Sequence, residues 1–166
     1  MLELDKIDLQ LLEALQRDGR VTNQSLGERV HLSASQVSRR IQRLEEGGLL
    51  EQCVTLLRPA RIGLTVTAFT RVSLERHGET YNDAFDKAVQ AMPEILECHS
   101  VTGPYDYLLR IVSVDLESFA QFMMHRLMRL PGVRSVESSI VLQQIKRTTA
   151  LPLEQAHAAC ARPWRS

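Results

Sequence analysis

The chain has 166 residues, and its 44% hydrophobic and 24% charged residues are typical of a globular protein with one domain or two small ones. Its 20 basic residues balance 20 acidic ones, which excludes a protein that attracts polyanions through its overall charge. No apolar run approaches the ~20 residues that span a bilayer. Acidic residues interrupt the apolar N-terminal sequence, which excludes a signal peptide. We therefore expect a cytoplasmic protein without a membrane partner.

The first third of the chain has the pattern of three short helices. Residues 5–18 carry apolar side chains at helical spacing, with Asp5 as the N-cap. A second helix is expected to begin at Thr22 or Asn23. A third helix follows a short connection at residues 31–33. Two helices joined by such a tight turn, after a first helix, predict a helix-turn-helix motif.

The third helix, residues 33–46, is the candidate for contact with nucleic acid. Ser33 and Gln36 fit a capping box at its start. Its apolar side chains recur every three or four residues and define the buried stripe: Val37, Ile41 and Leu44. Arg39 then lies nearly opposite this stripe, whereas Arg40 lies at its edge, where it contacts a phosphate or covers the core. A solvated helix face is the alternative to a DNA contact, and the helices around it argue against that alternative.

The side chains on this helix suit DNA. Arginine can bridge the O6 and N7 atoms of guanine, glutamine can pair with adenine, and serine can reach a phosphate. Helix-turn-helix proteins insert the N-terminal part of the second helix of the motif into the major groove. Arg39 is expected to read a base and Arg43 to contact a phosphate. The candidate DNA-binding residues are Ser33, Ser35, Gln36, Ser38, Arg39, Arg40, Gln42 and Arg43.

In the second half of the chain, the spacing of the apolar residues changes. After a β-prone run at residues 49–59, which predicts a strand or wing, alternating and helical patterns follow one another. The expected elements are a strand at 66–74, a helix at 80–92, strands at 94–103 and 105–114 around a Gly-Pro turn, a helix at 116–130 and a strand at 132–147. This βαββαβ order is that of a ferredoxin-like domain, an antiparallel sheet with two helices on one face.

The predicted fold class is therefore α+β, in two domains. A winged helix-turn-helix domain occupies residues 1–50, and a linker strand residues 51–63. The ferredoxin-like domain occupies residues 64–149. Residues 150–166 are expected to form a tail that is mobile or packs on a partner.

Two stretches of sequence, in this order, resemble the Lrp/AsnC family of bacterial and archaeal transcription regulators. The resemblance runs from Leu4 to about Pro152. In the first half it rests on "LDKIDLQLLEALQRDGRVTNQSLGERVHLSASQVSRRIQRLEEGGLL". In the second half it rests on "VTGPYDYLLRIVSVDLESF", "LMRLPGVRSVESSIVLQQIK" and "ALPL". It implies a regulator that binds double-stranded DNA and whose second domain binds a small effector, usually an amino acid. It also implies homodimers and higher assemblies, for which we expect tetramers or octamers.

The resemblance further implies an effector loop between the second and third strands of that domain, with more contacts near Leu116 and from the last strand. The residues themselves are compatible with this role, because Gly103 permits a turn whose N–H groups face a carboxylate and Asp106 can accept hydrogen bonds from an ammonium group. A plain hairpin turn, capped by Asp106 with its tyrosines packed on neighbours, is the alternative. Ser138 stands where the family commonly has threonine, which puts the size of the pocket in question. The candidate effector residues are Thr102, Gly103, Tyr105, Asp106, Tyr107, Leu116, Ser138 and Ser139.

Other functions have less support. The sequence lacks a Walker loop and the GxGxxG, GxSxG and HExxH motifs, so we expect neither an enzyme nor a cofactor. The three cysteines form no CxxC pair, and buried or idle thiols in a reducing cytoplasm are the expectation. A winged-helix metal or redox sensor remains an alternative, and it would need at least two of Cys53, Cys98 and His99 to converge. A protein-interaction module that has lost DNA binding is the other alternative.

Overall fold

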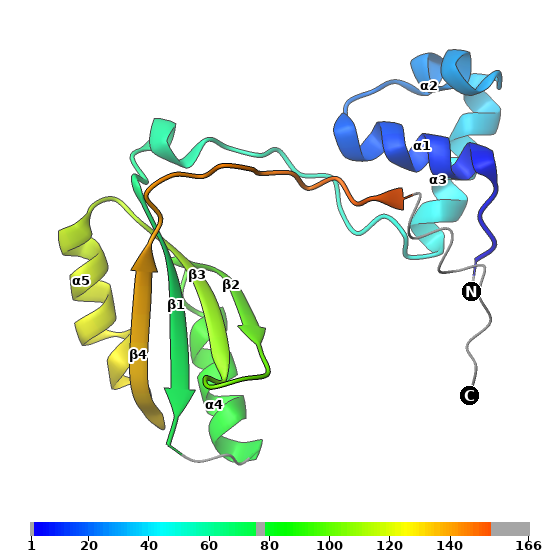
Figure 1. Ribbon diagram of the computed structural model, residues 1–166. Helices are drawn as coiled ribbons and strands as arrows, with labels where there is room; N and C mark the ends of the chain where they lie inside the picture. The colour runs from blue at the N-terminus through cyan, green and yellow to red at the C-terminus, as the bar shows by residue number, and fades with distance from the viewer. Residues whose placement is uncertain (1, 76–78, 154–166) are drawn as a thin grey trace. The chain divides into compact units, whose positions relative to one another are not determined.

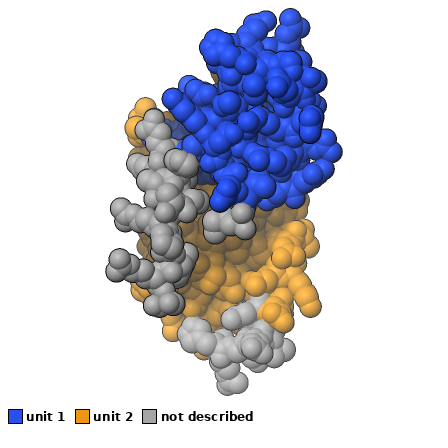
Figure 2. Space-filling view, turned by 90° about the vertical axis from the view of Figure 1, so that its right-hand side faces the viewer, with its two compact units in different colours: residues 1–56, 146–166 blue, residues 57–145 orange. Residues whose placement is uncertain are grey.

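The computed structural model describes residues 2–75 and 79–153, which group into two compact units (Figure 2). Unit 1 contains the described residues of 1–56 and 146–166, and unit 2 contains those of 57–145. Residues 146–149 thus group with the N-terminal helices, whereas the sequence assigned them to the second domain. Of the predicted tail, residues 154–166 lie outside the described residues. No helix within the described ranges is long and apolar enough to cross a membrane.

Unit 1 is built around α1 (Lys6–Arg17), α2 (Asn23–Val30) and α3 (Ala34–Glu46) (Figure 1). The predicted starts of these helices are confirmed, because the side chains of Asp5, Thr22 and Ser33 each accept a hydrogen bond from the first turn. These caps satisfy backbone N–H groups that have no partner within the helix. The apolar stripes of the helices meet in a small core formed by Leu11, Leu26, Val30 and Val37.

The turn between α2 and α3 depends on Gly27 and His31. His31 has a φ of 57°, a left-handed conformation that ends α2. The Leu32 N–H then donates to the Gly27 carbonyl oxygen at 2.9 Å. A Cβ atom on residue 27 would lie 2.3 Å from the carbonyl oxygen of Leu32, so only glycine allows this close approach. The turn fixes the direction in which α3 leaves α2.

Unit 2 has the predicted βαββαβ order. Its strands are β1 (Val66–Leu74), β2 (Ile95–Ser100), β3 (Tyr107–Ser113) and β4 (Val133–Ile140), and its helices are α4 (Glu79–Gln90) and α5 (Leu116–His125). The strands form one antiparallel sheet in the order β2-β3-β1-β4 (Figure 1). Alternate residues of β1 face the core, as the sequence predicted, and all are buried: Val66, Ala68, Thr70, Val72 and Leu74.

Both helices cover the same face of this sheet. The core on that face combines side chains of α4, such as Phe85 and Val89, with side chains of α5, such as Phe119 and Met123. Leu109 of β3 lies between them with no exposed surface. The other face carries the alternate strand residues, and Phe69 on it is 41% exposed. We refer to this second face as the open sheet face.

Three expectations about the elements are wrong. Residues 49–58 form neither a strand nor a wing, because the described strands pair only among themselves and a lone segment has no partner for its N–H and C=O groups. Pro59–Ile62 instead form a short 3-10 helix. The helix expected at 116–130 ends at His125 and continues as a 3-10 turn, Leu127–Arg129. The last strand, expected at residues 132–147, ends at Ile140.

Candidate nucleic-acid interface and effector loop

The polar side of α3 is accessible over its whole length. Val37 and Leu44 have no exposed surface, which fixes the buried side of the helix. Arg39, on the opposite side, is exposed and has no hydrogen bond, ion pair or ring contact with any described residue. Of the candidate DNA-binding residues, only Arg40 is half-buried, and the following are exposed: Ser33, Ser35, Gln36, Ser38, Arg39, Gln42 and Arg43.

Several of these polar side chains already serve the helix itself. The Gln36 Oε1 atom accepts a hydrogen bond from the Ser33 N–H at 2.9 Å, which completes the capping box. The Ser33 hydroxyl lies 3.0 Å from that of Ser35. The Gln42 amide donates to Glu46 Oε1 at 2.9 Å. Among the candidate DNA-binding residues, Arg39 and Ser38 therefore remain without such a local role within the described chain.

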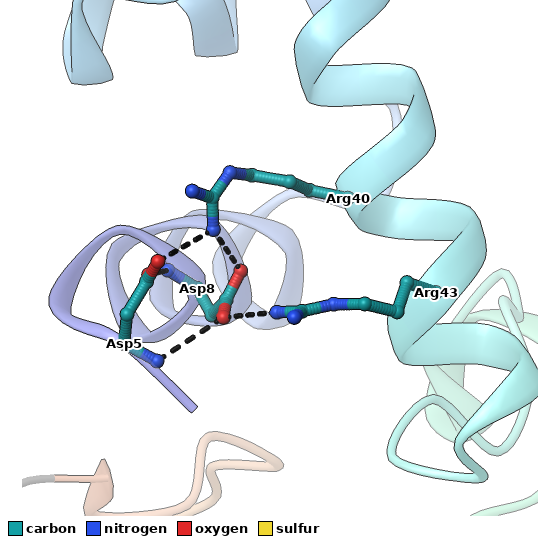
Figure 3. Close-up of polar contacts among 4 residues, drawn as sticks. All are labelled: Asp5, Asp8, Arg40 and Arg43. Carbon is teal, nitrogen blue, oxygen red and sulfur yellow. Dashed lines mark hydrogen bonds and ion pairs between the residues drawn. The ribbon is translucent and has the colours of Figure 1, made fainter. Parts of the chain in front are cut away.

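Arg40 and Arg43 point from α3 toward the start of α1 and meet two carboxylates there (Figure 3). Arg40 Nη1 donates to Asp8 Oδ1 at 2.7 Å and to Asp5 Oδ2 at 2.8 Å. Arg43 Nη2 donates to Asp8 Oδ2. The Asp8 side chain is 0% exposed. Sequence reasoning missed this cluster, which consists of Asp5, Asp8, Arg40 and Arg43.

The contacts in the cluster shift the pKa values of two of its members. Hydrogen bonds to Asp5 and Asp8 raise the pKa of Arg40 further above its usual value. Partial desolvation acts to raise the pKa of Asp5, but hydrogen bonds from the Asp8 N–H and from Arg40 outweigh it and lower that pKa. Both pKa shifts favour the charged forms of Asp5 and Arg40, as expected for two side chains that form an ion pair.

The loop between β2 and β3 carries the predicted effector residues. Thr102 and Gly103 are exposed, and Gly103 has a φ of 129°, a backbone conformation that strains other residues. Asp106 is half-buried, and its Oδ2 atom accepts a hydrogen bond from the Leu74 N–H at 2.7 Å. Its own N–H donates to the Val72 carbonyl oxygen at 2.9 Å. Asp106 thus fixes the loop to the end of β1.

The two tyrosines of this loop lie in different places. Tyr107 is a core residue, 6% exposed, with its ring centroid 4.6 Å from that of Phe85. Burial, with a hydrogen bond to Asp86, raises the pKa of Tyr107 to about 12. The Tyr107 side chain lies on the face of β3 that packs against the helices, so almost none of it is accessible to an effector at the loop. Tyr105 stays in the loop, where the guanidinium of Arg71 lies 5.4 Å from its ring centroid.

Arg71 links the loop to the last strand. Besides the ring of Tyr105, it contacts Glu137 of β4, with Arg71 Nη1 3.3 Å from Glu137 Oε1. The alternation of β1 puts Arg71 on the open sheet face, and this pattern is the sequence signal for its position. The structure therefore brings the loop and β4 together through a residue of β1.

The remaining effector candidates are spread over the unit. Ser138 is paired with Thr70 of β1, and their hydroxyl oxygens are 2.9 Å apart. Ser139 is the register partner of Phe69 on the open sheet face. Leu116 is the first residue of α5 and is 60% exposed. Within the described residues, Leu116 makes no hydrogen bond or ring contact with the loop.

A shallow, open cavity of about 460 Å³ lies on α5, away from residues 102–107. The side chains of Glu94 and Arg126 form an ion pair in its wall, and the Arg126 guanidinium lies 5.3 Å from the ring centroid of Phe122. The cavity is lined by Glu94, Glu117, Ser118, Gln121, Phe122, His125 and Arg126. None of these residues is among the site candidates that the sequence predicts.

The residues of the metal or redox alternative do not form a described ligand set. Cys53 and Cys98 are free, exposed thiols, and they belong to different units. Although the residue is exposed, partial desolvation of its thiol and the nearby Asp86 carboxylate raise the pKa of Cys98 to about 11, which favours the protonated, less reactive thiol at neutral pH. Across residues 2–75 and 79–153, no three His, Cys, Asp or Glu side chains are grouped to hold a metal ion.

Comparisons with known proteins agree with this arrangement. Residues 4–45 match the model of the AsnC-type helix-turn-helix domain, and residues 67–151 match that of the Lrp/AsnC ligand binding domain. The chain is 39% identical over 151 residues to the DNA-binding transcriptional activator DecR of Escherichia coli, covering 91% of this chain and 99% of that protein. It is 34% identical over 152 residues to the leucine-responsive regulatory protein of the same organism, covering 92% of this chain and 93% of that protein. A transcriptional regulator of Neisseria meningitidis, solved as a complex with L-Met, is 41% identical with a TM-score of 0.89, covering 93% of this chain and 99% of the other.

Proposed function

This chain belongs to the Lrp/AsnC family of transcriptional regulators, and we propose that α3 is the helix that it inserts into DNA, with Arg39 as the side chain that reads a base. As a member of that family it is a DNA-binding transcriptional regulator and not an enzyme. Because its partner is chromosomal DNA, we expect the chain in the cytoplasm, at the nucleoid.

The exposure of Arg39 is the observation that supports this assignment. Arg39 is exposed opposite the buried Val37 and Leu44, and it is not held by any described residue. An unengaged guanidinium can bridge the O6 and N7 atoms of a guanine, which is the commonest specific contact in the major groove. Ser35 and Ser38, near the start of the same helix, would donate to neighbouring phosphates.

Competition binding tests the role of Arg39. The duplex to use is one that the protein itself selects from a pool of random sequences. Arg39→Ala should weaken binding to that duplex by roughly 1–3 kcal/mol and should leave binding to unselected DNA much less affected. Ser38→Ala, a truncation on the same exposed side, is the matched control and should retain selectivity. Equal selectivity of the Arg39 variant and the parent would exclude the assignment.

The proposed effector is an amino acid, bound at the loop between β2 and β3. Support comes from the relatives, one named for its response to leucine and one solved with L-Met. Support also comes from the exposed Gly103, around which backbone N–H groups can approach a carboxylate. The carboxylate of Asp106 is also the kind of group that accepts hydrogen bonds from an ammonium group, and its bond from the Leu74 N–H ties it to the end of β1. Thr102, Tyr105, Ser138 and Ser139 would complete the site.

Melting temperatures measured against each amino acid would identify the effector, because a ligand that binds the folded state raises stability. Asp106→Asn should then weaken its binding by about 1.5–3 kcal/mol in calorimetry. The asparagine oxygen can still accept from the Leu74 N–H, so the loop should remain folded. Gln121→Ala, in the cavity on α5, is the control. Loss of binding in the Gln121 variant alone would place the effector in that cavity instead.

We further propose that the chain assembles as a homodimer and then as tetramers or octamers. The open sheet face supports this, because Phe69 is exposed there beside two ion pairs, Arg71–Glu137 and Arg110–Glu97. A second copy, turned by a two-fold rotation, would cover the apolar centre and match these charges. Val54 and Leu56 lie in residues 49–58, which form no helix or strand, and both are 57% exposed, so they offer a second contact with a copy. Light scattering should show at least a dimer for the parent and smaller species for Phe69→Glu. A monomeric parent at micromolar concentration would exclude this proposal.

A further inference from the structure

We infer that Asp8 is a positioning residue that holds Arg40 and Arg43 away from DNA phosphates and so limits binding to unselected DNA. The inference rests on the proposed insertion of α3 into DNA. It reverses the sequence-based expectation for Arg43, which was a phosphate contact that strengthens binding to every sequence.

The geometry of the cluster carries the inference. The Asp8 carboxylate lies under α3 with no exposed surface, and each of its oxygen atoms holds one arginine of that helix (Figure 3). Oδ2 also accepts from the Asp5 N–H at 3.1 Å, so the carboxylate is fixed by the backbone of α1. Both guanidiniums are therefore drawn toward α1 by a group that cannot move with them.

The charges lead to the same conclusion. The exposed fractions of the Arg40 and Arg43 side chains are 28% and 46%, so both arginines border the solvent that DNA would displace. Their two positive charges are balanced by Asp5 and Asp8 at contact distance. Each phosphate contact that a protein makes adds about 0.9 to the slope of log affinity against log salt. Two arginines withheld from phosphates therefore make binding to random DNA weaker and less sensitive to salt.

The consequence is selectivity. Phosphate contacts strengthen binding to all sequences alike, whereas base contacts strengthen binding to the target only. With Arg40 and Arg43 balanced, a larger share of the binding free energy comes from Arg39 and its neighbours on the exposed side of α3.

The test measures the affinity of the full chain for random-sequence duplex DNA over a series of salt concentrations. Asp8→Asn removes the negative charge, and its amide oxygen can still accept from the Asp5 N–H. The salt slope should become steeper by about 0.9 to 1.8 per bound protomer. Affinity for random DNA at low salt should rise on the order of tenfold, with a smaller rise for the selected duplex. Asp5→Asn, which keeps a good N-cap and releases only one bond of Arg40, should fall between the parent and Asp8→Asn.

A double substitution, Arg40→Gln with Arg43→Gln, shows whether Asp8 acts through these arginines. In that background Asp8→Asn should no longer change the slope, a result that a purely structural role would not produce. If Asp8→Asn does not fold, the salt slope of Asp5→Asn tests the inference instead, and it should be steeper than that of the parent. An unchanged slope, or a flatter one with weaker binding, overturns the inference. The Arg39→Ala measurement is independent, so failure of the recognition-helix assignment would be seen separately.

Discussion

Ion pairs between arginine and carboxylate occur in both units, but their surroundings differ. In unit 1, Arg40 and Arg43 meet Asp8, whose side chain is 0% exposed. In unit 2, Arg71 meets Glu137, and the exposed fractions of these side chains are 39% and 77%. Water screens the second pair and solvates each partner when the pair opens, whereas a buried carboxylate without its arginines has no such substitute. Pairs of the same chemistry should therefore stabilise the two units very differently.

The largest effect is expected for Asp8→Ala. This change leaves two arginines beside an emptied position and removes the hydrogen bond to the Asp5 N–H. We expect the free energy of unfolding to fall by about 3 kcal/mol, near the lower end for a broken buried pair because both arginines reach solvent. Urea unfolding, followed by the circular dichroism of the helices, would measure it. A loss below about 0.5 kcal/mol, the scale of an exposed pair, would remove the distinction between the units.

The sequence predicted the elements around these pairs better than the pairs themselves. Helical spacing located the helices of unit 1, and the caps Asp5 and Ser33 located where two of them begin. Such signals are local, since each joins residues three or four positions apart. Asp8 and Arg40 are separated by 32 positions, and no periodicity indicates which charged side chain faces which.

The effector loop shows the same limit. The turn at Gly103 and the strands on both sides were predicted correctly because they depend on local patterns. Tyr107 was assigned to the loop, but the register of β3 turns it into the core against Phe85. Arg71 was missed because its contacts with Tyr105 and Glu137 join three separate segments.

A smaller effect is expected for Gln16→Ala, which separates residues 146–153 from α1. The Gln16 amide makes two hydrogen bonds with Leu151, to its carbonyl oxygen at 3.0 Å and from its N–H at 2.8 Å. Their loss should reduce the stability of unit 1 by about 1 kcal/mol, since exposed neutral hydrogen bonds contribute little. Hydrogen exchange should become faster at the Leu151 amide and stay unchanged in β3. Unchanged exchange at Leu151 would show that other contacts hold this segment.

Acid should affect unit 1 through Asp5. Because the folded state lowers the pKa of Asp5 below its ordinary value of 3.8, the ionised carboxylate stabilises the fold above that pH. This contribution should disappear as the pH falls from 3.8 through the pKa of the folded state. Unfolding measured against pH should therefore show a stability difference between the parent and Asp5→Asn at neutral pH that vanishes in strong acid. A difference that is constant with pH would contradict this account of the cluster.

The smallest effect is expected for Glu137→Ala in unit 2. The exposed pair with Arg71 should contribute less than about 1 kcal/mol to the free energy of unfolding. The change should be seen instead in effector binding, because Arg71 would lose one of its two fixed contacts beside Tyr105. Calorimetry with the identified amino acid would measure it, with Glu117→Ala on α5 as the control. A loss of stability as large as that of Asp8→Ala would contradict the comparison.

Methylation interference on the selected duplex tests most directly whether Arg39 reads a base while Arg40 and Arg43 are held by Asp8. Methylation of guanine N7 blocks a bidentate arginine contact in the major groove. For the parent, methylation of one guanine in each half-site should prevent binding. Binding of Arg39→Ala should no longer depend on methylation of that guanine, whereas binding of Arg43→Ala should show the same interference pattern as the parent. If the Arg39 variant remains as sensitive as the parent, or if the Arg43 variant loses the pattern, then Arg39 is not the side chain that reads the base.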